Sequence, residues 1–506
     1  MMKRAASYFL AAILVLLTVS ANLTPAQAVT PIQHEHETFF PRGVPASTGC
    51  PYPTDNGCAM APANGVFQDA TLLTSAQQSG QNSLLPGHPM TFNIPGVDYP
   101  IGYDKTKTLK DPRTINDSVC QSAGTFIDCS STGGGVVNEV LDGYDFSGTT
   151  IGQPAIGIYA PNNHISAGST LTVTNSKFAV LSNGPGGNGD LVDIGGNFNN
   201  LVFKYNVCDG TSADATAGFC IGSGSTGTGS MDVEYNAFTN MGVGRIAGGL
   251  TNNSFTTKYN YISGLNSLNT TNHGELMLRN CTGSRMNCVA FDDYEGNFIV
   301  WPCCVTFTGS NGDNTTFFPS DGSSDGVTLT SMTISNNIVV VNSPASGNGQ
   351  PDQALFNSRL STMGTVTMTG NWVDATGSND CSISGVKAGG NNVTASTSGN
   401  TLTVTGTSSS FNNNPIEPGW LIIHSGFTTT PITAYGTGGG NTGTYTFGGS
   451  PQTLGSDSNW TLVPGYSGTP TLTGNYNLAD PSHTGIPVAM GLNGPQFTAT
   501  HCSPHY

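Results

Sequence analysis

The chain has few charged residues and very few basic ones. Only 9% of its 506 residues are charged, and 15 Lys and Arg stand against 31 Asp and Glu, for a formal net charge of −16. A nucleic-acid partner is disfavoured, because binding to phosphates needs a basic surface. An acidic polysaccharide stays open, since a local basic patch in one groove can outweigh the net charge.

Long apolar runs are missing after the N-terminus. The chain begins with the basic pair Lys3-Arg4, an apolar run over residues 9–19 and the small-x-small site Ala26-Gln27-Ala28. This pattern predicts a signal peptide over residues 1–28, and its apolar run is too short for a typical membrane span. We therefore expect a secreted protein (extracellular, periplasmic or at the cell surface) with no transmembrane segment after cleavage.

A CxxC pair, the usual spacing of zinc-binding cysteines, is also missing from the twelve cysteines. An even number of cysteines in an exported chain favours disulfides. We expect four sequence-local pairs and leave Cys303, Cys304, Cys381 and Cys502 unassigned. The expected pairs are Cys50–Cys58, Cys120–Cys129, Cys208–Cys220 and Cys281–Cys288.

A short motif ending in Asn recurs after segments of strand character. Its clearest copies are Lys204-Tyr205-Asn206, Glu234-Tyr235-Asn236 and Lys258-Tyr259-Asn260. We place the same position at Asp145, Asn175, Asn297, Asn337, Asn371 and, after a long gap, Asn475. Spacings of 24–40 residues in a strand-rich chain are typical of a solenoid, in which no single repeat can bury its own apolar face. Asn tolerates the left-handed backbone at a bend, and stacked Asn side chains can hydrogen-bond along a ladder.

The segment Leu141–Phe146 leads into these Asn-ended repeats. Together they resemble the right-handed parallel β-helix proteins of the pectate-lyase-like superfamily, over about residues 115–380 and 465–490. The resemblance implies an all-β fold built as a right-handed parallel β-helix. It also implies a polysaccharide partner, because proteins of this superfamily mostly bind or cleave polysaccharides in a groove along one outer sheet.

The other segments are organised around this solenoid. Residues 384–464 alternate strongly, are rich in Thr and are broken by Gly runs, which predicts a small antiparallel β-module inserted near the C-terminus. This segment resembles a β-module of bacteriophage tail proteins. The expected organisation is a signal peptide (1–28), an N-terminal extension and cap (29–115), the parallel β-helix (116–383), the inserted β-module (384–464), and a final repeat with a C-terminal tail (465–506).

The strand around His273 carries the strongest candidates for catalysis. His273, Glu275 and Arg279 alternate with other residues, so a period of two places them on one face. A His-x-carboxylate on an outer strand resembles a pattern of alginate-lyase-like β-helix proteins. We expect His273 to act as acid and base and Glu275 to orient it or to bind Ca²⁺. Arg245 or Arg279 would hold a substrate carboxylate.

Two further sets of residues are candidates for substrate binding. Asp193 is expected to share one outward column with Arg245, His273 and Glu275. Tyr205, Tyr235 and Tyr259 precede the Asn of three consecutive repeats, and their alternation with apolar residues predicts that they point outward. An exposed row of Tyr rings would stack on sugar rings. The plainer alternative is that all these residues form a solvated face with charges paired between repeats.

The leading hypothesis is a polysaccharide lyase that cleaves an acidic glycan by β-elimination, in which either Ca²⁺ or an Arg would neutralise the substrate carboxylate. The first alternative is a non-catalytic glycan-binding surface protein, similar to an adhesin or tail-spike shaft. The second is a glycoside hydrolase, which needs two carboxylates. Asp292-Asp293 matches part of the polygalacturonase pattern, but we interpret this stretch as a loop and the other two motifs are missing. The sequence does not assign a metal or an oligomeric state.

Overall fold

The computed structural model describes about half of the chain, mostly strands and the tight bends between them. The described residues are 95, 101–104, 107–130, 135–160, 168–179, 191–194, 198–209, 220–223, 229–239, 246–248, 253–263, 277–279, 288–301, 315–318, 327–341, 353–358, 362–374, 382–386, 390–406, 416, 420–437, 442–463, 465–466, 471–477, 489–491 and 494–498.

Most strands belong to three long sheets that are parallel except at the ends of the largest one. The twelve-stranded sheet contains β1 (Gln121–Ser122), β2 (Phe126–Asp128), β4 (Gly157–Ala160), β7 (Val192–Ile194), β10 (Ile221–Ser223), β13 (Ile246–Gly248), β16 (Met277–Arg279), β19 (Thr315–Phe318), β22 (Gln353–Ser358), β25 (Ser382–Val386), β36 (Gly494–Thr498) and β35 (Ala489–Gly491). The ten-stranded sheet contains β3 (Asn138–Asp142), β5 (Ser169–Thr174), β8 (Phe198–Lys204), β11 (Ser230–Glu234), β14 (Asn253–Lys258), β17 (Cys288–Glu295), β20 (Val327–Ser335), β23 (Thr362–Thr369), β32 (Gly465–Tyr466) and β33 (Thr471–Thr473). The eight-stranded sheet contains β6 (Lys177–Ala179), β9 (Val207–Asp209), β12 (Ala237–Thr239), β15 (Tyr261–Ser263), β18 (Phe298–Trp301), β21 (Ile338–Val341), β24 (Trp372–Asp374) and β34 (Tyr476–Asn477).

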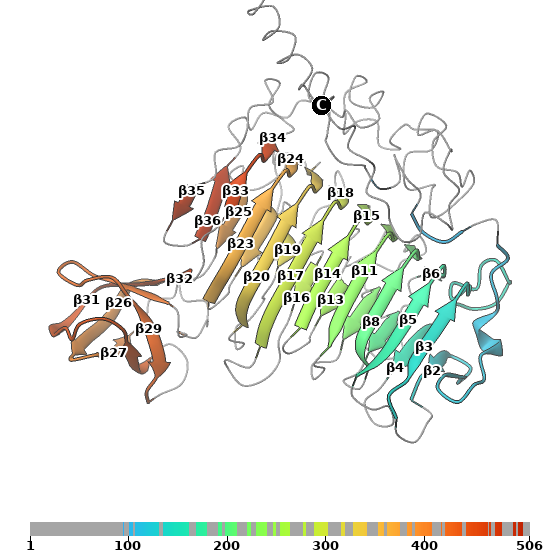
Figure 1. Cartoon of the computed structure of the whole chain (residues 1–506), viewed down its shortest axis with the longest axis horizontal. Coiled ribbons are helices and arrows are strands. Elements are labelled where there is room, and N and C mark those ends of the chain that lie inside the picture. The colour runs from blue at the N-terminus through green and yellow to red at the C-terminus, as the bar shows by residue number, and fades with distance from the viewer. Residues whose placement is uncertain are drawn as a thin grey trace, which may run out of the picture.

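Through the middle of the chain, every third strand enters the same sheet. Thus β7, β8 and β9 are followed by β10, β11 and β12, and each strand pairs in parallel with its counterpart three strands later. We call one such set of three strands a coil. In Figure 1 the strands of the ten-stranded sheet lie side by side in chain order, from β3 to β23. The predicted all-β fold with long parallel sheets is confirmed.

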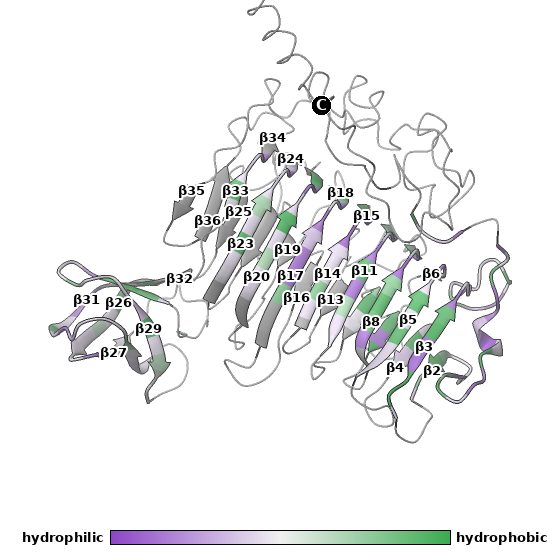
Figure 2. Cartoon of the chain, in the orientation of Figure 1, coloured by the Kyte–Doolittle hydropathy of each residue, from purple (hydrophilic) through white to green (hydrophobic). Residues whose placement is uncertain are grey.

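Alternation along each strand builds the core between the sheets. In β5 the buried Leu171 and Val173 alternate with half-buried Thr residues, and Figure 2 shows hydrophobic and hydrophilic residues within the same strands. The parallel register stacks Leu171 on Leu201, and Leu201 on Met231, in successive coils. All of these side chains belong to one continuous apolar core, so each coil buries its inner face against its neighbours.

Each coil bends sharply where the ten-stranded sheet passes into the eight-stranded one. One residue at this bend has a positive φ between 50° and 75° in nine coils, as a left-handed bend requires. These residues are Gly143, Asn175, Tyr205, Tyr235, Tyr259, Gly296, Asn336, Gly370 and Gly474. The next residue is an almost fully buried Asn in the last seven of these coils. We call these seven the Asn column: Asn206, Asn236, Asn260, Asn297, Asn337, Asn371 and Asn475.

The Asn column is linked from coil to coil by hydrogen bonds. The main-chain N–H of Asn206 donates to Oδ1 of Asn236 at 2.8 Å, and the same bond recurs up to Asn371, which donates to Asn475 at 3.2 Å. Each side-chain amide nitrogen also donates to a main-chain carbonyl of the preceding coil, as Asn236 does to Phe203 at 2.8 Å. The column therefore pairs polar groups of the bends that burial would otherwise leave unsatisfied.

Two positions predicted for this column are wrong. Asn175 has the left-handed backbone itself, and Ser176 takes the place of the column residue beside Asn206. Asp145 lies two residues after the left-handed Gly143 and bridges Lys177. The prediction failed because Asn is compatible both with the left-handed position of the bend and with the column position that follows it. The left-handed residue is the one before the column, so Tyr205, Tyr235 and Tyr259 hold the strained backbone.

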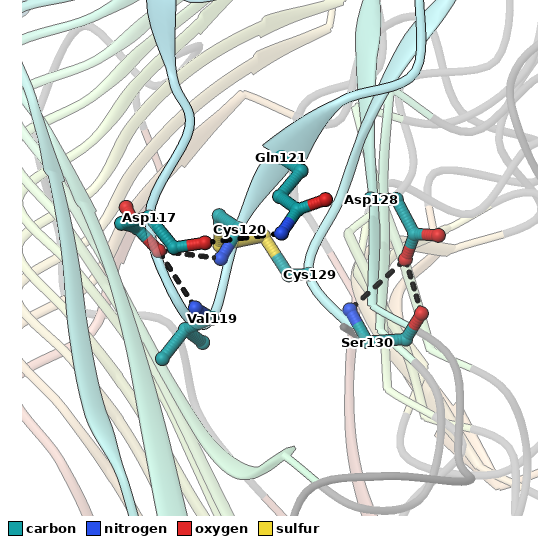
Figure 3. Close-up of a disulfide and its surroundings, with 7 residues drawn as sticks. All are labelled: Asp117, Val119, Cys120, Gln121, Asp128, Cys129 and Ser130. Atoms are coloured by element: carbon teal, nitrogen blue, oxygen red, sulfur yellow. Dashed lines mark hydrogen bonds between the residues drawn. A yellow bond between two sulfur atoms is a disulfide. The ribbon is translucent and has the colours of Figure 1, made fainter. Parts of the chain in front are cut away.

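Antiparallel strands close both ends of the twelve-stranded sheet. Strand β1 pairs with β2 at one edge, and β36 and β35 cover the other. Near the first edge, Oδ1 of Asp117 accepts the main-chain N–H groups of Val119 and Cys120, both at 2.7 Å, beside the Cys120–Cys129 disulfide (Figure 3). A short 3₁₀ helix, η3 (Pro112–Thr114), precedes this turn. Covered edges cannot pair with other chains.

The antiparallel module predicted near the C-terminus is a closed barrel of six strands. Its strands are β26 (Gly390–Ser398), β27 (Thr401–Gly406), β28 (Leu421–Ile423), β29 (Thr430–Tyr435), β30 (Gly443–Phe447) and β31 (Leu454–Val463). The barrel has its own apolar core around Trp420 and Trp460 and lies at the C-terminal end of the sheets in Figure 1. After it, β33 and β34 rejoin the parallel sheets.

Two of the predicted disulfides, Cys120–Cys129 and Cys208–Cys220, are present. Such bonds form and persist in oxidising surroundings, which agrees with an extracellular protein. The other cysteine predictions involve residues outside the described part of the chain. Within the described residues, the structure has no helix of the length and hydropathy needed to cross a membrane.

Candidate functional site

Most of the predicted catalytic residues lie outside the described part of the chain. This holds for Arg245, His273 and Glu275. Arg279 ends β16, and its backbone pairs with Gly248 of β13. Their roles in catalysis therefore stay predictions.

Asp193 lies in β7 between the buried Val192 and Ile194, and its own side chain is half-buried. Burial raises the pKa of its carboxyl group above the usual value. The register aligns Asp193 with Gly222 of β10, so a small residue is its neighbour in the next coil. A carboxyl group that retains its proton to higher pH is suited to general acid–base chemistry.

The register does not place Asp193 and Arg279 in one column. Arg279 pairs with Gly248 of β13. Since Ile246 pairs with Ile221 of β10, Gly248 is level with Ser223, which pairs with Ile194 of β7. Arg279 is thus one residue out of step with Asp193. The Asn repeat could not give this register, because the number of residues between the twelve-stranded and ten-stranded sheets differs from coil to coil.

The three tyrosines stack on one another in coil order, but they are not the exposed row that the sequence predicted. The rings of Tyr205 and Tyr235 are 4.9 Å apart and nearly parallel, and Tyr259 follows at 5.2 Å. Tyr205 and Tyr235 are only 3% and 4% exposed, so the expected outward track is wrong for these two. The N-terminal segment crosses this place, where the N–H of Gly102 donates to the carbonyl of Tyr235 at 2.8 Å. Burial, and then negative neighbours that include Glu295, raise the pKa of Tyr259 above the usual phenol value.

A cluster of charged side chains, missed in the sequence, occupies the outer face of the ten-stranded sheet. Nζ of Lys204 lies 2.7 Å from Asp232 and 2.9 Å from Glu234, and Nζ of Lys258 lies 2.5 Å from Asp293 and 3.1 Å from Glu295. We call these six residues the charged cluster: Lys204, Asp232, Glu234, Lys258, Asp293 and Glu295. The alternation Lys, Glu, Lys two residues before Asn206, Asn236 and Asn260 was the sequence signal for it.

Electrostatics within the charged cluster follow from these contacts. Burial alone lowers the pKa of Lys204, but its contacts with Asp232 and Glu234 outweigh burial and raise that pKa. Burial, and then the neighbouring Asp232, raise the pKa of Glu234 despite the opposing effect of Lys204. Two cations face four carboxylates, so the cluster carries a net charge of about −2 when all six groups are ionised.

Asp292-Asp293 was predicted to lie in a loop, and the structure places both residues in β17. Asp293 faces outward in the charged cluster, whereas Asp292 is 2% exposed in the core and accepts a hydrogen bond from the Tyr294 hydroxyl at 3.2 Å. The loop interpretation failed because a strand with a buried carboxylate breaks the usual apolar alternation. Within the described residues, no three His, Cys, Asp or Glu side chains converge in a way that could hold a metal ion.

Comparison of the chain with protein-family models, curated protein sequences and solved structures found no match. The function is therefore argued from the sequence and from the geometry of the chain itself.

Proposed function

We propose that this is an exported, carbohydrate-active protein whose coils form a right-handed parallel β-helix of the pectate-lyase-like kind. The signal-like N-terminus and the two disulfides support export. The arrangement of three strands per coil, each paired in parallel with the next coil, supports the β-helix.

The observation that carries the glycan partner is a long polar row on the outer face of the ten-stranded sheet. In seven of eight successive strands, the residue at one register position has a hydroxyl or a carboxylate side chain. The side chains at this position are half-buried or exposed. The row is Thr172, Val202, Asp232, Thr256, Asp293, Thr333, Thr367 and Thr471. At about 4.8 Å between strands the row is roughly 34 Å long, which suits an extended, hydroxyl-rich polymer.

For the reaction we propose β-elimination on an acidic glycan. His273 would take the proton from C5 of a uronate unit while the C4–O4 bond breaks and a C4–C5 double bond forms. As the acid, His273 would then return this proton to the departing O4. Glu275 would orient His273, and Arg245 or Arg279 would hold the uronate carboxylate. The raised pKa of Asp193, on the same sheet as Arg279, supports acid–base chemistry there.

The test is turnover of uronate polymers. Purified protein is incubated with alginate, pectate or glucuronan, and the absorbance of the unsaturated product is followed for the wild type and for His273→Ala, with His164→Ala as the matched control. We expect a signal that is lost only in His273→Ala. No product from any polymer, or equal rates in both variants, would overturn the lyase proposal.

A second candidate is a non-catalytic, glycan-binding shaft. It is favoured by the charged cluster, in which Lys204 and Lys258 are each paired with two carboxylates from the next coil and so resemble a stabilising network. Binding of a glycan without turnover, measured by calorimetry on the same polymers, would favour this candidate over the lyase.

A further inference from the structure

Phe291 is an apolar side chain on an otherwise polar surface. Its side chain is 44% exposed on the outer face of β17. The residues that flank it in register are Ser254 of β14 and Ser331 of β20. An exposed Phe ring loses the free energy of apolar burial, so its position between two Ser side chains calls for an explanation.

The backbone beside Phe291 is irregular. Pairing between β17 and β20 shifts between Ala290 and Phe291, which leaves Thr330 without a partner in that register. The next strand, β23, also has one residue between the two pairing positions, since Leu329 pairs with Met363 and Ser331 with Thr365. Bulges of this kind re-aim side chains and occur often beside binding sites.

Hydrogen-bonding groups lie next to the exposed ring on the same face. Asp293 follows Phe291 by two residues, and the register places Thr256 on one side of it and Thr333 on the other. The Asp293 side chain is 35% exposed, and its Oδ2 contacts Lys258 at 2.5 Å. A ring face beside a carboxylate and two hydroxyls is the combination that binds a sugar, with its apolar face on the ring and its hydroxyls on the acceptors.

The charge of the surroundings selects the kind of sugar. The two lysines of the charged cluster are already paired with carboxylates, and the whole chain has a net charge of −16. A carboxylate-bearing sugar would meet an excess of negative charge here, whereas a neutral or amino sugar would not.

We propose that Phe291 and Asp293, with Thr256 and Thr333, form a subsite for a sugar unit without a carboxylate, either neutral or carrying an amino group. This subsite rests on the proposed glycan binding along the ten-stranded sheet. It is separate from the predicted catalytic strand in the twelve-stranded sheet, so a heteropolysaccharide could place its acidic and its uncharged units on different faces.

The test compares three ligands and three variants of the full mature chain by titration calorimetry. The ligands are chitosan oligosaccharides, xylo-oligosaccharides and oligogalacturonates. The variants are Phe291→Ala, Phe291→Tyr and the control Val136→Ala, which removes another exposed apolar side chain (64% exposed) from the segment just before β3, outside the polar row. We expect the wild type to bind xylo- or chitosan oligosaccharides, with Phe291→Ala about tenfold weaker and the other two variants unchanged.

The outcomes separate this subsite from the function on which it rests. Binding of a neutral or amino oligosaccharide that is unaffected by Phe291→Ala would overturn the subsite and leave glycan binding standing. Tighter binding of oligogalacturonates that Phe291→Ala weakens would overturn the charge selection. No binding of any of the three ligands by the wild type would overturn both the subsite and the proposed glycan binding.

Discussion

The parallel coils and the antiparallel barrel bury their side chains in different ways. In the coils, each apolar residue stacks on its counterpart in the next coil, and the Asn column lies inside with the apolar residues. In the barrel, Trp420, Trp460 and Leu402 belong to a separate core that contains only residues of the barrel itself. Each coil therefore depends on its neighbours for stability, whereas the barrel has a complete core of its own and is expected to fold as a unit.

The polar contacts of the two regions differ as well. The coils have a continuous line of paired amides. In the barrel, the His424 ring stacks on Trp460 at 4.2 Å and its Nε2 lies 2.9 Å from Asp457. A repeated network links many coils, so a local defect should spread further there than in a small closed barrel.

Asn297→Ala should have the largest effect, and it should act on the coils alone. The substitution leaves the N–H of Asn260 and the carbonyl of Thr257 without their side-chain partner in the core. At about 1–3 kcal/mol for each unsatisfied group, we expect a loss of about 4 kcal/mol in the free energy of unfolding. Denaturant unfolding followed by far-UV circular dichroism measures it.

Asn200→Ala is the control for this prediction, because Asn200 lies on the outer face of the ten-stranded sheet, where it accepts hydrogen bonds from Ser230. Its loss should be about 1 kcal/mol. Equal effects of the two substitutions would show that the Asn column is not a special source of stability.

Leu402→Ala should have the next largest effect and should act on the barrel alone. Leu402 is fully buried in the barrel core, so its truncation should lower stability by about 3 kcal/mol. The chain has four Trp, and replacing Trp301 and Trp372 by Phe leaves Trp420 and Trp460 as fluorescent reporters of the barrel. A Leu402→Ala transition that moves together with that of the coils would contradict independent unfolding.

The sequence predicted the repeating coils better than it predicted the residues on their outer faces. The Asn repeat is readable because one buried position needs one side chain with both a donor and an acceptor. Outward positions carry no such restriction, so Phe291 and the charged cluster did not stand out. The tyrosines were misplaced because alternation within a strand does not extend through a bend with a left-handed residue.

Gly296→Ala should have a smaller effect and should show how the bends differ from one coil to the next. Gly296 has a φ of 64°, and an added Cβ would lie 2.6 Å from the Tyr259 ring. We expect a loss of about 2 kcal/mol. Tyr235 has a φ of 58° at the same position of an earlier coil, so Tyr235→Gly should be about 1 kcal/mol more stable than Tyr235→Ala. Thermal unfolding of the three variants measures this, and the reverse order for Tyr235 would exclude backbone strain there.

The smallest predicted effects have opposite signs in the two regions and depend on pH. Burial raises the pKa of Asp193 in the coils, so the stability linked to this group is fully present below its unfolded pKa of about 3.8 and is lost as pH rises through the folded value. In the barrel, a hydrogen bond from the main chain at Asn459 and then contact with His424 lower the pKa of Asp457. Its contribution is present above about pH 3.8 and is lost as pH falls through the folded value.

Asp193→Asn and Asp457→Asn form a matched pair that tests these signs. At pH 7 Asp193→Asn should raise the melting temperature of the coils, because it removes the cost of a half-buried charge, and the gain should vanish below about pH 3. Asp457→Asn should lower the melting temperature of the barrel at pH 7 and change little at pH 3. Melting curves between pH 3 and pH 7, read by circular dichroism for the coils and by Trp420 and Trp460 fluorescence for the barrel, measure both. A higher melting temperature at pH 7 for both variants would contradict the prediction, because it would mean that the hydrogen bonds of Asp457 do not stabilise the barrel.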